Sequence, residues 1–460
     1  MGRTVLMACF VVSPLLHGGT FGAVDVDGVK IELADAAGPA TVRAEMVAKH
    51  NLRIDVDPRG VRQPLTIRVQ LPISGRGYWP AEDVVVVDAS GEPIAARHNG
   101  TAWEEFTITV PPVRASYTVR AVQPKAPRPR VFPEEERSVA DPTTGVRAKI
   151  TNWYNGRRVA LCLRFDDSHP THLSTVIPLL RQYRFRATFM INPGTPDQRS
   201  PRRWRSAYQE HKAEWEAVAR EGDQEFANHT AHHRGAADDE EMEHEIGDAA
   251  KVIWSLFPHR SKLLALNLGG GTWWVTKRPL RYYLDKYPSF LVTGSLGMDD
   301  TYGNRVAAFR QHLERNLAPN RLGWCKVHFH SVGKGAASSE ENFRAVLEII
   351  KQHESQIWIA GLADAYKYLT ERRGAKLSIR STGSDRVALE LSCTTNPELF
   401  DHPLTIDVGL PEPWARGHVV VTDVQGNVLA ANRVPTLAGG ETLLRFNVPP
   451  TDTTCLIERR

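Results

Sequence analysis

Two adjacent carboxylates, Asp166 and Asp167, directly follow the apolar run 159–165. That run is typical of a buried strand, and in a parallel α/β barrel the carboxyl ends of the strands are where catalytic groups collect. Two aspartates after a strand can also simply cap the next helix. The pair is therefore open to two interpretations, and a second motif is needed to choose between them.

That second motif contains His229 and His233, which are four residues apart. On a helix with Asn228 as its N-cap both imidazoles would share one face, and His232 would point about 100° away from His233. Two histidines and one aspartate are enough for a catalytic zinc site that keeps one position open for water. A polar helix face is the alternative, but the aspartate pair favours a metal site formed by His229, His233 and one of the two aspartates.

A third candidate element is the run 324–331, whose residues alternate as they do in a strand. His328 and His330 would project to one side and Phe329 to the other. We expect one histidine to face the site. His330 is the better candidate, and His328 is better explained as a core histidine.

A glycine run and a tryptophan pair lie between these motifs. Residues 269–271 are all glycine, but no Lys followed by Ser or Thr comes after them, which excludes a phosphate-binding loop of that type. Trp273 and Trp274 could stack on sugar rings or could equally pack in a core. His169, just after the aspartates, is a weaker candidate for the site.

From about residue 150 the chain alternates strands with amphipathic helices, which indicates βα units and parallel strands. Eight such units would close a barrel, so we expect an α/β fold, an irregular (β/α) barrel over residues 146–375. The expected strands include 159–165, 186–191 and 356–360, and the expected helices include 173–183, 340–353 and 362–373.

An internal repeat brackets this central part. Residues 64–72, PLTIRVQLP, recur as residues 403–411, PLTIDVGLP. Short β-branched runs cut by Gly and Pro indicate antiparallel strands. Each copy is therefore expected to form a small β-sandwich-like module, at 24–122 and at 376–460. The proline-rich stretch 123–145 is expected to be a linker.

With 57 basic and 53 acidic residues, the 460-residue chain has a net charge of only +4. No concentrated basic face is evident, so no nucleic acid is expected as a partner. Residues 1–23 are typical of a secretory signal peptide, which predicts export to the periplasm, the cell surface or the medium. No later run approaches the ~20 apolar residues of a spanning helix, so no integral membrane segment is expected. Cys162 and Cys325 are expected to be buried free thiols.

These motifs resemble those of polysaccharide deacetylases of the NodB-homology type, over about residues 150–370. Residues 164–167, RFDD, resemble the Thr/Ser-Phe-Asp-Asp motif of that family, and residues 229–233 match its His-Ser/Thr-x-x-His. Residues 186–189 resemble its Ala-Thr-Phe strand, and residues 327–330 resemble its late Leu-x-Leu-His strand.

The resemblance implies a hydrolase that removes acetyl groups, N- or O-linked, from an acetylated polysaccharide or oligosaccharide. It implies that Asp166 is the general base and that Asp167, His229 and His233 hold a divalent metal ion, usually Zn²⁺. It also implies that His330 is the general acid. The chemistry agrees, since a metal ion lowers the pKa of water and polarises a carbonyl, while positioned side chains transfer the protons.

The sequence departs from the family at two places. The Arg-Pro-Pro-Tyr-like segment that orients the base corresponds here to residues 266–274, which contain no arginine. Arg164, Arg278 or Arg281 could replace it, and the sequence does not choose among them. Ser168 stands where a glycine commonly follows the aspartate pair.

Two other functions would use the same residues. One is a non-catalytic carbohydrate-binding protein whose deacetylase site is degenerate. The other is an iron(II) oxygenase that uses the two histidines and one aspartate as its ligands. The oxygenase is disfavoured, because such enzymes are usually built on β-sandwich cores and the ligands here fall in βα units.

Overall fold

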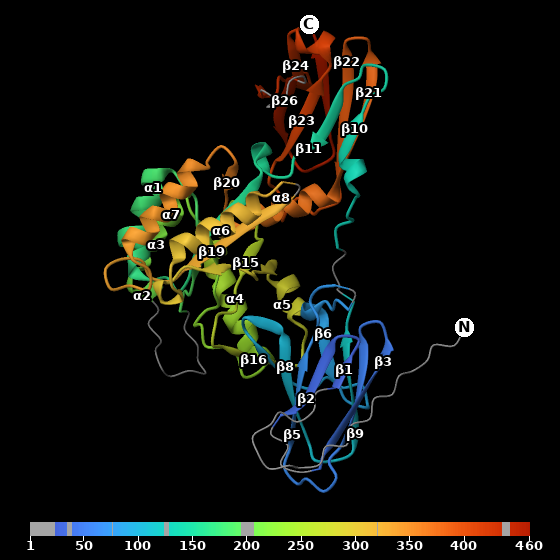
Figure 1. The fold of residues 1–460 in the computed structure, drawn as a ribbon, viewed down its shortest axis with the longest axis vertical. Helices are drawn as coiled ribbons and strands as arrows, with labels where there is room; N and C mark the ends of the chain where they lie inside the picture. Colours follow the sequence, from blue (N-terminus) through green and yellow to red (C-terminus); the bar gives the residue numbers. More distant parts are fainter. Residues whose placement is uncertain are drawn as a thin grey trace, which may run out of the picture.

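The computed structural model describes residues 24–34, 39–75, 77–123, 128–194, 207–319, 321–434 and 442–460. The predicted signal peptide, residues 1–23, lies outside the described residues. A central α/β part lies between two parts made mainly of strands, one N-terminal and one C-terminal (Figure 1). None of the helices in these ranges is long and apolar enough to cross a membrane.

The central part contains an eight-stranded sheet in which every pairing is parallel. Its order is β17-β15-β14-β13-β12-β19-β18, and β20 also pairs with β12. Among the described residues no pairing joins the two outer strands, so the sheet is an open half-barrel and not a closed barrel. The strands are β12 (Val159–Phe165), β13 (Thr188–Ile191), β14 (Glu225–Asn228), β15 (Leu264–Leu266), β17 (Ser289–Leu291), β18 (Leu296–Gly297), β19 (Gly323–Phe329) and β20 (Ile357–Ile359).

Helices follow the parallel strands, as βα units require. The predicted helices at 340–353 and 362–373 are confirmed to within two residues, whereas the predicted helix at 173–183 begins as a π-helical turn, His172–Val176. The α-helices are α1 (Ile177–Tyr183), α2 (Ala207–Glu210), α3 (Lys212–Glu221), α4 (Asp239–Leu256), α5 (Leu280–Lys286), α6 (Arg305–Leu317), α7 (Glu340–Gln352), α8 (Leu362–Gly374) and α9 (Glu412–Ala415). The 3-10 turns are η1 (Ala81–Asp83), η2 (Glu134–Arg137), η3 (Tyr154–Gly156) and η5 (Asp300–Tyr302).

The N-terminal part forms two antiparallel sheets, with the orders β1-β2-β5-β8-β7-β16 and β3-β4-β9-β6. The last strand of the first sheet, β16, comes from the central part of the chain and pairs with β7 (Figure 1). The strands are β1 (Val24–Val26), β2 (Val29–Ala34), β3 (Thr41–Ala48), β4 (Asn51–Asp57), β5 (Leu65–Gln70), β6 (Val84–Val87), β7 (Ala96–Asn99), β8 (Ala102–Val110), β9 (Ala115–Ala121) and β16 (Trp273–Thr276).

The C-terminal part also forms two antiparallel sheets, with the orders β10-β11-β23-β26-β25 and β21-β22-β27-β24. Strands β10 and β11 precede the central part in the chain, yet β11 pairs with β23. The strands are β10 (Ser138–Ala140), β11 (Arg147–Ile150), β21 (Ala375–Gly383), β22 (Arg386–Cys393), β23 (Leu404–Leu410), β24 (Val419–Asp423), β25 (Ala431–Val434), β26 (Thr442–Val448) and β27 (Thr453–Arg459).

The sequence repeat corresponds to a repeat of strand order. The series β2-β5-β8-β7 of the N-terminal part has the same order and directions as β11-β23-β26-β25, and β3-β4-β9-β6 corresponds to β21-β22-β27-β24. The whole α/β part therefore lies between β11 and β21, where the N-terminal copy passes from β2 to β3 within a few residues. This explains why strands before residue 151 belong to the C-terminal sheets.

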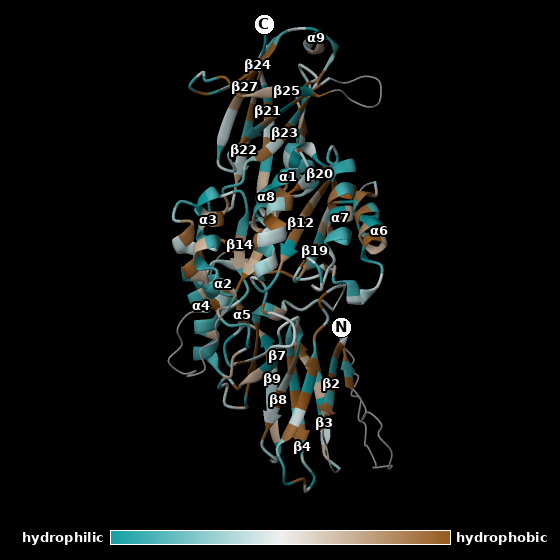
Figure 2. Ribbon diagram, turned by 90° about the vertical axis from the view of Figure 1, so that its left-hand side faces the viewer, coloured by the Kyte–Doolittle hydropathy of each residue, from teal (hydrophilic) through white to brown (hydrophobic). Residues whose placement is uncertain are grey.

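Two hydrophobic cores lie on opposite faces of the central sheet. Strand β12 is buried at all seven positions, as expected for a parallel strand covered on both faces. Leu163 and Phe165 belong to a core that continues into the N-terminal part, and Cys162 belongs to a core that continues into the C-terminal part. Figure 2 shows the hydrophobic colour along β12. Cys162 and Cys325 are buried free thiols, which confirms that prediction.

Candidate active site

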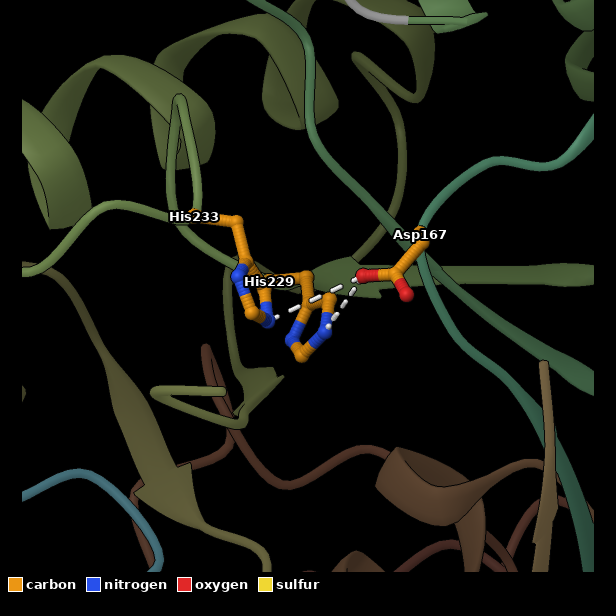
Figure 3. Close-up of side chains that lie close together, drawn as sticks. All are labelled: Asp167, His229 and His233. Carbon is orange, nitrogen blue, oxygen red and sulfur yellow. Dashed lines mark ion pairs between the residues drawn. The ribbon is translucent and has the colours of Figure 1, made fainter. Parts of the chain in front are cut away.

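The three side chains expected to bind a metal ion converge although they are far apart in the sequence. Asp167 follows β12, and His229 and His233 follow β14. One ligand atom from each of the three residues lies within 4.8 Å of the others. Oδ1 of Asp167 is 3.2 Å from Nε2 of His229 and 3.7 Å from Nε2 of His233 (Figure 3).

The prediction of a helix over His229–His233 is wrong, because these residues form a loop between β14 and α4. Thr230 and His233 have positive φ angles, 67° and 53°, which no right-handed helix accommodates. Asn228 is the last residue of β14 and does not cap a helix. Its Oδ1 accepts a hydrogen bond from the Thr230 N–H at 2.8 Å, and Thr230 Oγ1 accepts one from the His233 N–H at 3.0 Å. These two hydrogen bonds stabilise the turn in spite of its strained positive φ angles.

The orientation of both imidazoles is set by the loop after β15. Nδ1 of His229 lies 3.0 Å from the carbonyl oxygen of Asn267, which directs Nε2 toward Asp167. The ring of His233 lies against Gly269, where an added Cβ would be only 2.3 Å from Nε2 of His233. Metal-binding histidines commonly have their second nitrogen held in this way. The donor set and its supports therefore fit a divalent ion.

The carboxylate of Asp166 is buried next to this group. Nη2 of Arg164 donates to Oδ2 of Asp166 at 2.7 Å, and both side chains are buried. Burial raises the pKa of Asp166, but the positive charge of Arg164 and nearby histidines, His229 first, lower it, and the net shift is downward. Oδ1 of Asp166 is buried and has no hydrogen-bond partner among the described residues. Arg164 thus fixes Oδ2 of the ionised Asp166, whereas Oδ1 remains free to accept a hydrogen bond.

Of the three arginines that could replace the missing one, the structure brings only Arg164 to Asp166. Arg281 instead pairs with Asp83 of the N-terminal part, at 3.1 Å. Arg278 lies over the ring of Tyr282, 4.5 Å from its centroid. Arg164 reaches Asp166 because residues two apart on a strand project to the same face.

The turn that carries Asp167 is left-handed at two successive residues. Asp167 has φ 72° and Ser168 has φ 52°. Glycine adopts such a conformation without steric penalty, which explains the glycine expected at position 168. Ser168 has an interaction that glycine would lack, because its Oγ accepts a hydrogen bond from the Asn192 N–H at 3.0 Å. Burial raises the pKa of Asp167, but its contacts with His229, His233 and His330 lower it well below the ordinary value.

His330 lies on the other side of Asp167, with Nε2 4.0 Å from its Oδ2. Nδ1 of His330 is 2.7 Å from Oδ2 of Asp299, and the His330 N–H donates to Oδ1 of Asp299 at 3.3 Å. The sequence argument missed Asp299. A signal was present, because Asp299 and Asp300 come shortly after strand β18, much as Asp166 and Asp167 come after β12.

His328 lies on the same face of β19, and the two imidazole centroids are 5.8 Å apart. Nδ1 of His328 is 2.8 Å from Oγ of Ser295. Burial, and then the charge of Arg164, lower the pKa of His328 to about 4. His328 is therefore neutral near pH 7.

The two tryptophans differ in exposure. Trp274 is fully buried and its Nε1 donates to Oγ1 of Thr272 at 2.8 Å, so it packs in the core and cannot stack on a sugar. Trp273 points the other way along β16, is 44% exposed, and lies under the guanidinium of Arg97 at 4.3 Å. Of the pair proposed from the sequence, only Trp273 presents a ring to solvent.

Two further histidines, His169 and His232, lie near Asp167, His229 and His233. His232 is buried, and its Nδ1 lies 2.8 Å from Oε1 of Glu245 on α4. It thus supports the loop and does not join the ligand atoms. Nε2 of His169 is 3.8 Å from Oδ2 of Asp167, so His169 borders the site as a neighbour of the carboxylate.

Part of the chain that contains these residues matches the model of a known protein family. Residues 154–278 match the model described as polysaccharide deacetylase. A curated gellan lyase from a Bacillus species is 21% identical over 304 residues, which cover 58% of this chain. The match spans only 12% of that protein's own length.

Solved structures with similarity to the chain include three proteins of this kind. A peptidoglycan deacetylase from Bacillus subtilis is 16% identical, with 46% of this chain and 91% of that chain covered and a TM-score of 0.32. A family 4 acetyl xylan esterase from Clostridium thermocellum, in complex with a cobalt ion, is 18% identical, with 45% and 90% covered and a TM-score of 0.32. A CE4 family pseudoenzyme from Bacillus anthracis is 13% identical, with 45% and 64% covered and a TM-score of 0.32.

Proposed function

We propose that this protein is a metal-dependent hydrolase that removes acetyl groups from a carbohydrate, and the match of residues 154–278 to the polysaccharide deacetylase family model supports this proposal. The substrate would be a polysaccharide or oligosaccharide with N- or O-linked acetyl groups, and residues 1–23 would direct the protein out of the cytoplasm. The observation that carries the proposal is the convergence of Asp167, His229 and His233 on one point, directly beside a buried carboxylate.

Asp167, His229 and His233 would hold the divalent ion, and two nitrogens with one oxygen suit zinc with an open coordination position. When bound, such an ion supplies a Lewis acid that makes water more acidic and polarises the acetyl carbonyl. The histidine nitrogens facing Asp167 are the Nε2 atoms. Ligation through them keeps the contact between Nδ1 of His229 and the Asn267 carbonyl intact.

Asp166 would act as the general base. Its Oδ2 is held by Arg164, and its Oδ1 is the acceptor without a partner among the described residues. A carboxylate fixed through one oxygen presents the other in a constant position, which favours proton transfer from water at that atom. The ion pair with Arg164 also keeps Asp166 ionised, as a base must be before it reacts.

His330 would act as the general acid. Its Nδ1 is engaged by Asp299, so Nε2 is the nitrogen that faces Asp167 and the space beside it. A carboxylate on Nδ1 fixes the orientation of the ring, as in other histidine–carboxylate pairs. His330 would then donate the Nε2 proton to the leaving amine or alkoxide of the sugar.

The alternative of a carbohydrate-binding protein with a degenerate site rested on the missing arginine. The ion pair between Arg164 and the buried carboxylate of Asp166 supports a functional site over a degenerate one. The exposed ring of Trp273 remains available for sugar contact under either function.

The test combines a metal analysis of the purified protein with acetate release from chitin fragments, peptidoglycan and acetylated xylan. We expect about one divalent ion per chain and acetate release from at least one substrate. Asp166→Asn should abolish acetate release and retain the ion, whereas His233→Ala should lose both. Asp452→Asn, at an exposed turn of the C-terminal part, is the matched control and should change neither. Full metal occupancy without acetate release from any of these glycans would contradict the proposal.

A further inference from the structure

The loop that follows β15, residues 267–272, supports both histidines of the metal group. The carbonyl of Asn267 contacts Nδ1 of His229, and Gly269 lies against the ring of His233. Gly269 has φ 84° and offers no Cβ, so the ring of His233 occupies space that any larger residue would fill. A shift of this loop would therefore move both imidazoles.

The side chain of Thr272 ties this loop together. Its Oγ1 donates to the carbonyls of Leu268 and Gly269, at 2.9 Å each, and accepts from Nε1 of Trp274 at 2.8 Å. Thr272 and Trp274 are buried. The conformation at Gly269 thus depends on where Thr272 sits.

Thr272 is in turn held from outside the central part, by the turn between β7 and β8 of the N-terminal part. The N–H of Gly100 in that turn donates to the carbonyl of Thr272 at 3.1 Å. An added Cβ at Gly100 would lie 2.3 Å from Thr272 Oγ1 and 2.5 Å from the carbonyl oxygen of Gly269. No side chain fits between this turn and the loop.

A second contact joins the N-terminal sheet to the histidine loop. Strand β16 is the sixth strand of that sheet, and it also pairs with Ala236, three residues after His233. The Ala236 N–H donates to the carbonyl of Trp273 at 3.0 Å, and the Val275 N–H donates to the carbonyl of Ala236 at 2.8 Å. The loop bearing His229 and His233 is thus held on two sides by elements of the N-terminal sheet.

We propose that the N-terminal β module is a structural part of the metal site, and that Gly100 is a positioning residue for His233 that acts through Thr272 and Gly269. The proposal rests on the metal-binding function given above. The expected coupling follows from close packing, because a tightly packed interior transmits a displacement of one residue to its neighbours. Contact alone does not establish coupling, so the chain of contacts requires a direct test.

The test compares Gly100→Ala with Gly383→Ala in the full-length protein. Both changes add one methyl group, but Gly383 is exposed at the end of β21 in the C-terminal part, and a Cβ there would meet no atom of the described residues within 4 Å. The readouts are the affinity for Zn²⁺ and Co²⁺ by calorimetry, the absorption spectrum of bound Co²⁺, and hydrogen exchange of residues 264–276. We expect Gly100→Ala to weaken metal binding roughly 10-fold, to alter the Co²⁺ spectrum and to speed exchange in that segment. Gly383→Ala should stay within about twofold of the native metal affinity, because its added methyl group contacts nothing near the histidines.

A second variant covers the case in which Gly100→Ala does not fold. Oδ1 of Asn99 accepts from the N–H and Oγ1 of Thr101, at 3.0 Å each, and so fixes the turn. Asn99→Ala loosens the turn and should produce the same changes to a smaller degree. Native metal affinity and native exchange in both folded variants would overturn the proposal. Hydrogen exchange reports on the loop without any metal or substrate, so a native protein that binds metal but releases no acetate would count against the proposed function alone.

Discussion

The guanidinium of Arg164 lies 2.7 Å from Oδ2 of Asp166, and the two residues occupy the same face at the end of β12. Arg164 is the last polar residue of β12, and Asp166, the proposed base, follows that strand directly. Both side chains are buried, so neither charge has water as an alternative partner.

Removal of this arginine tests its role. Arg164→Met leaves Asp166 as an uncompensated buried carboxylate, which destabilises proteins by about 3 to 5 kcal/mol. We expect the rate of acetate release to fall by about 10²-fold or more, while the bound metal is retained because Arg164 touches none of the three ligands. Arg164→Lys keeps the positive charge and should recover part of the lost stability and part of the lost rate of acetate release. Single-turnover acetate release, metal content and urea unfolding measure these effects, and an Arg164→Met protein with native turnover would refute the assignment.

The pair formed by Asp299 and His330 gives a second prediction. Asp299→Asn removes the charge that fixes Nδ1 of His330, and we expect kcat to fall by roughly 10²-fold with little change in KM. The double variant Asp299→Asn/His330→Gln should be no slower than His330→Gln alone, because the two residues act as one unit. Steady-state kinetics on the best substrate provides the measurement. Additive losses in the double variant would mean that Asp299 acts independently of His330.

Ser168 gives a prediction about backbone conformation. Ser168→Gly relieves the left-handed φ of 52° but loses the bond from the Asn192 N–H, so stability should change by less than about 1 kcal/mol. Ser168→Val places a β-branched residue in the same conformation and should lower both stability and metal affinity. Thermal unfolding of the two variants with and without zinc decides the matter. Equal tolerance of glycine and valine would show that the turn relaxes.

The tryptophan pair is a matched test of packing against binding. Trp274→Ala removes a fully buried side chain from the core shared with the N-terminal part and should destabilise the protein by about 3 to 5 kcal/mol. Trp273→Ala removes an exposed ring and should leave stability nearly unchanged while raising KM for a polymeric substrate. Urea unfolding and kinetics on long and short substrates separate the two effects. An unaltered KM in Trp273→Ala would exclude that ring as a sugar contact.

Glu371 on α8 predicts a dependence of stability on pH. Burial raises its pKa from 4.5 to about 8, and Oε1 accepts only the His402 N–H at 2.9 Å, while Oε2 has no partner among the described residues. The folded state therefore binds the proton more tightly than the unfolded state, so the free energy of unfolding falls as pH rises from about 4.5 to about 8. Glu371→Gln should lose this component, and its advantage over the native protein should grow between about pH 5 and pH 9. Urea midpoints at both values check it, and parallel midpoints for the two proteins would contradict it.

Short-range information in the sequence was enough for several features. The apolar run 159–165 predicted β12, the alternation of strands and helices predicted parallel pairing, and the repeated PLTI segments became the equivalent strands β5 and β23. Asp167, His229 and His233 were predicted to form one ligand set from residue type and position after a strand, which are local properties, and the structure brings the three side chains together. The four-residue spacing of the histidines, in contrast, predicted a helix where the chain forms a loop, because tertiary hydrogen bonds outweighed the local pattern.

The sequence alone thus indicated three residues that could share a metal ion, and it predicted the alternation of strands and helices in the central part. Only the tertiary structure decided that Arg164, and not Arg278 or Arg281, pairs with Asp166, that Asp299 supports His330, and that Trp274 is in the core. It also decided that β10 and β11 join the C-terminal sheet and that β16 joins the N-terminal one. The physical reason is that hydrogen bonding, burial and packing between distant segments depend on where the chain places them in space, and no local pattern of residues specifies that placement.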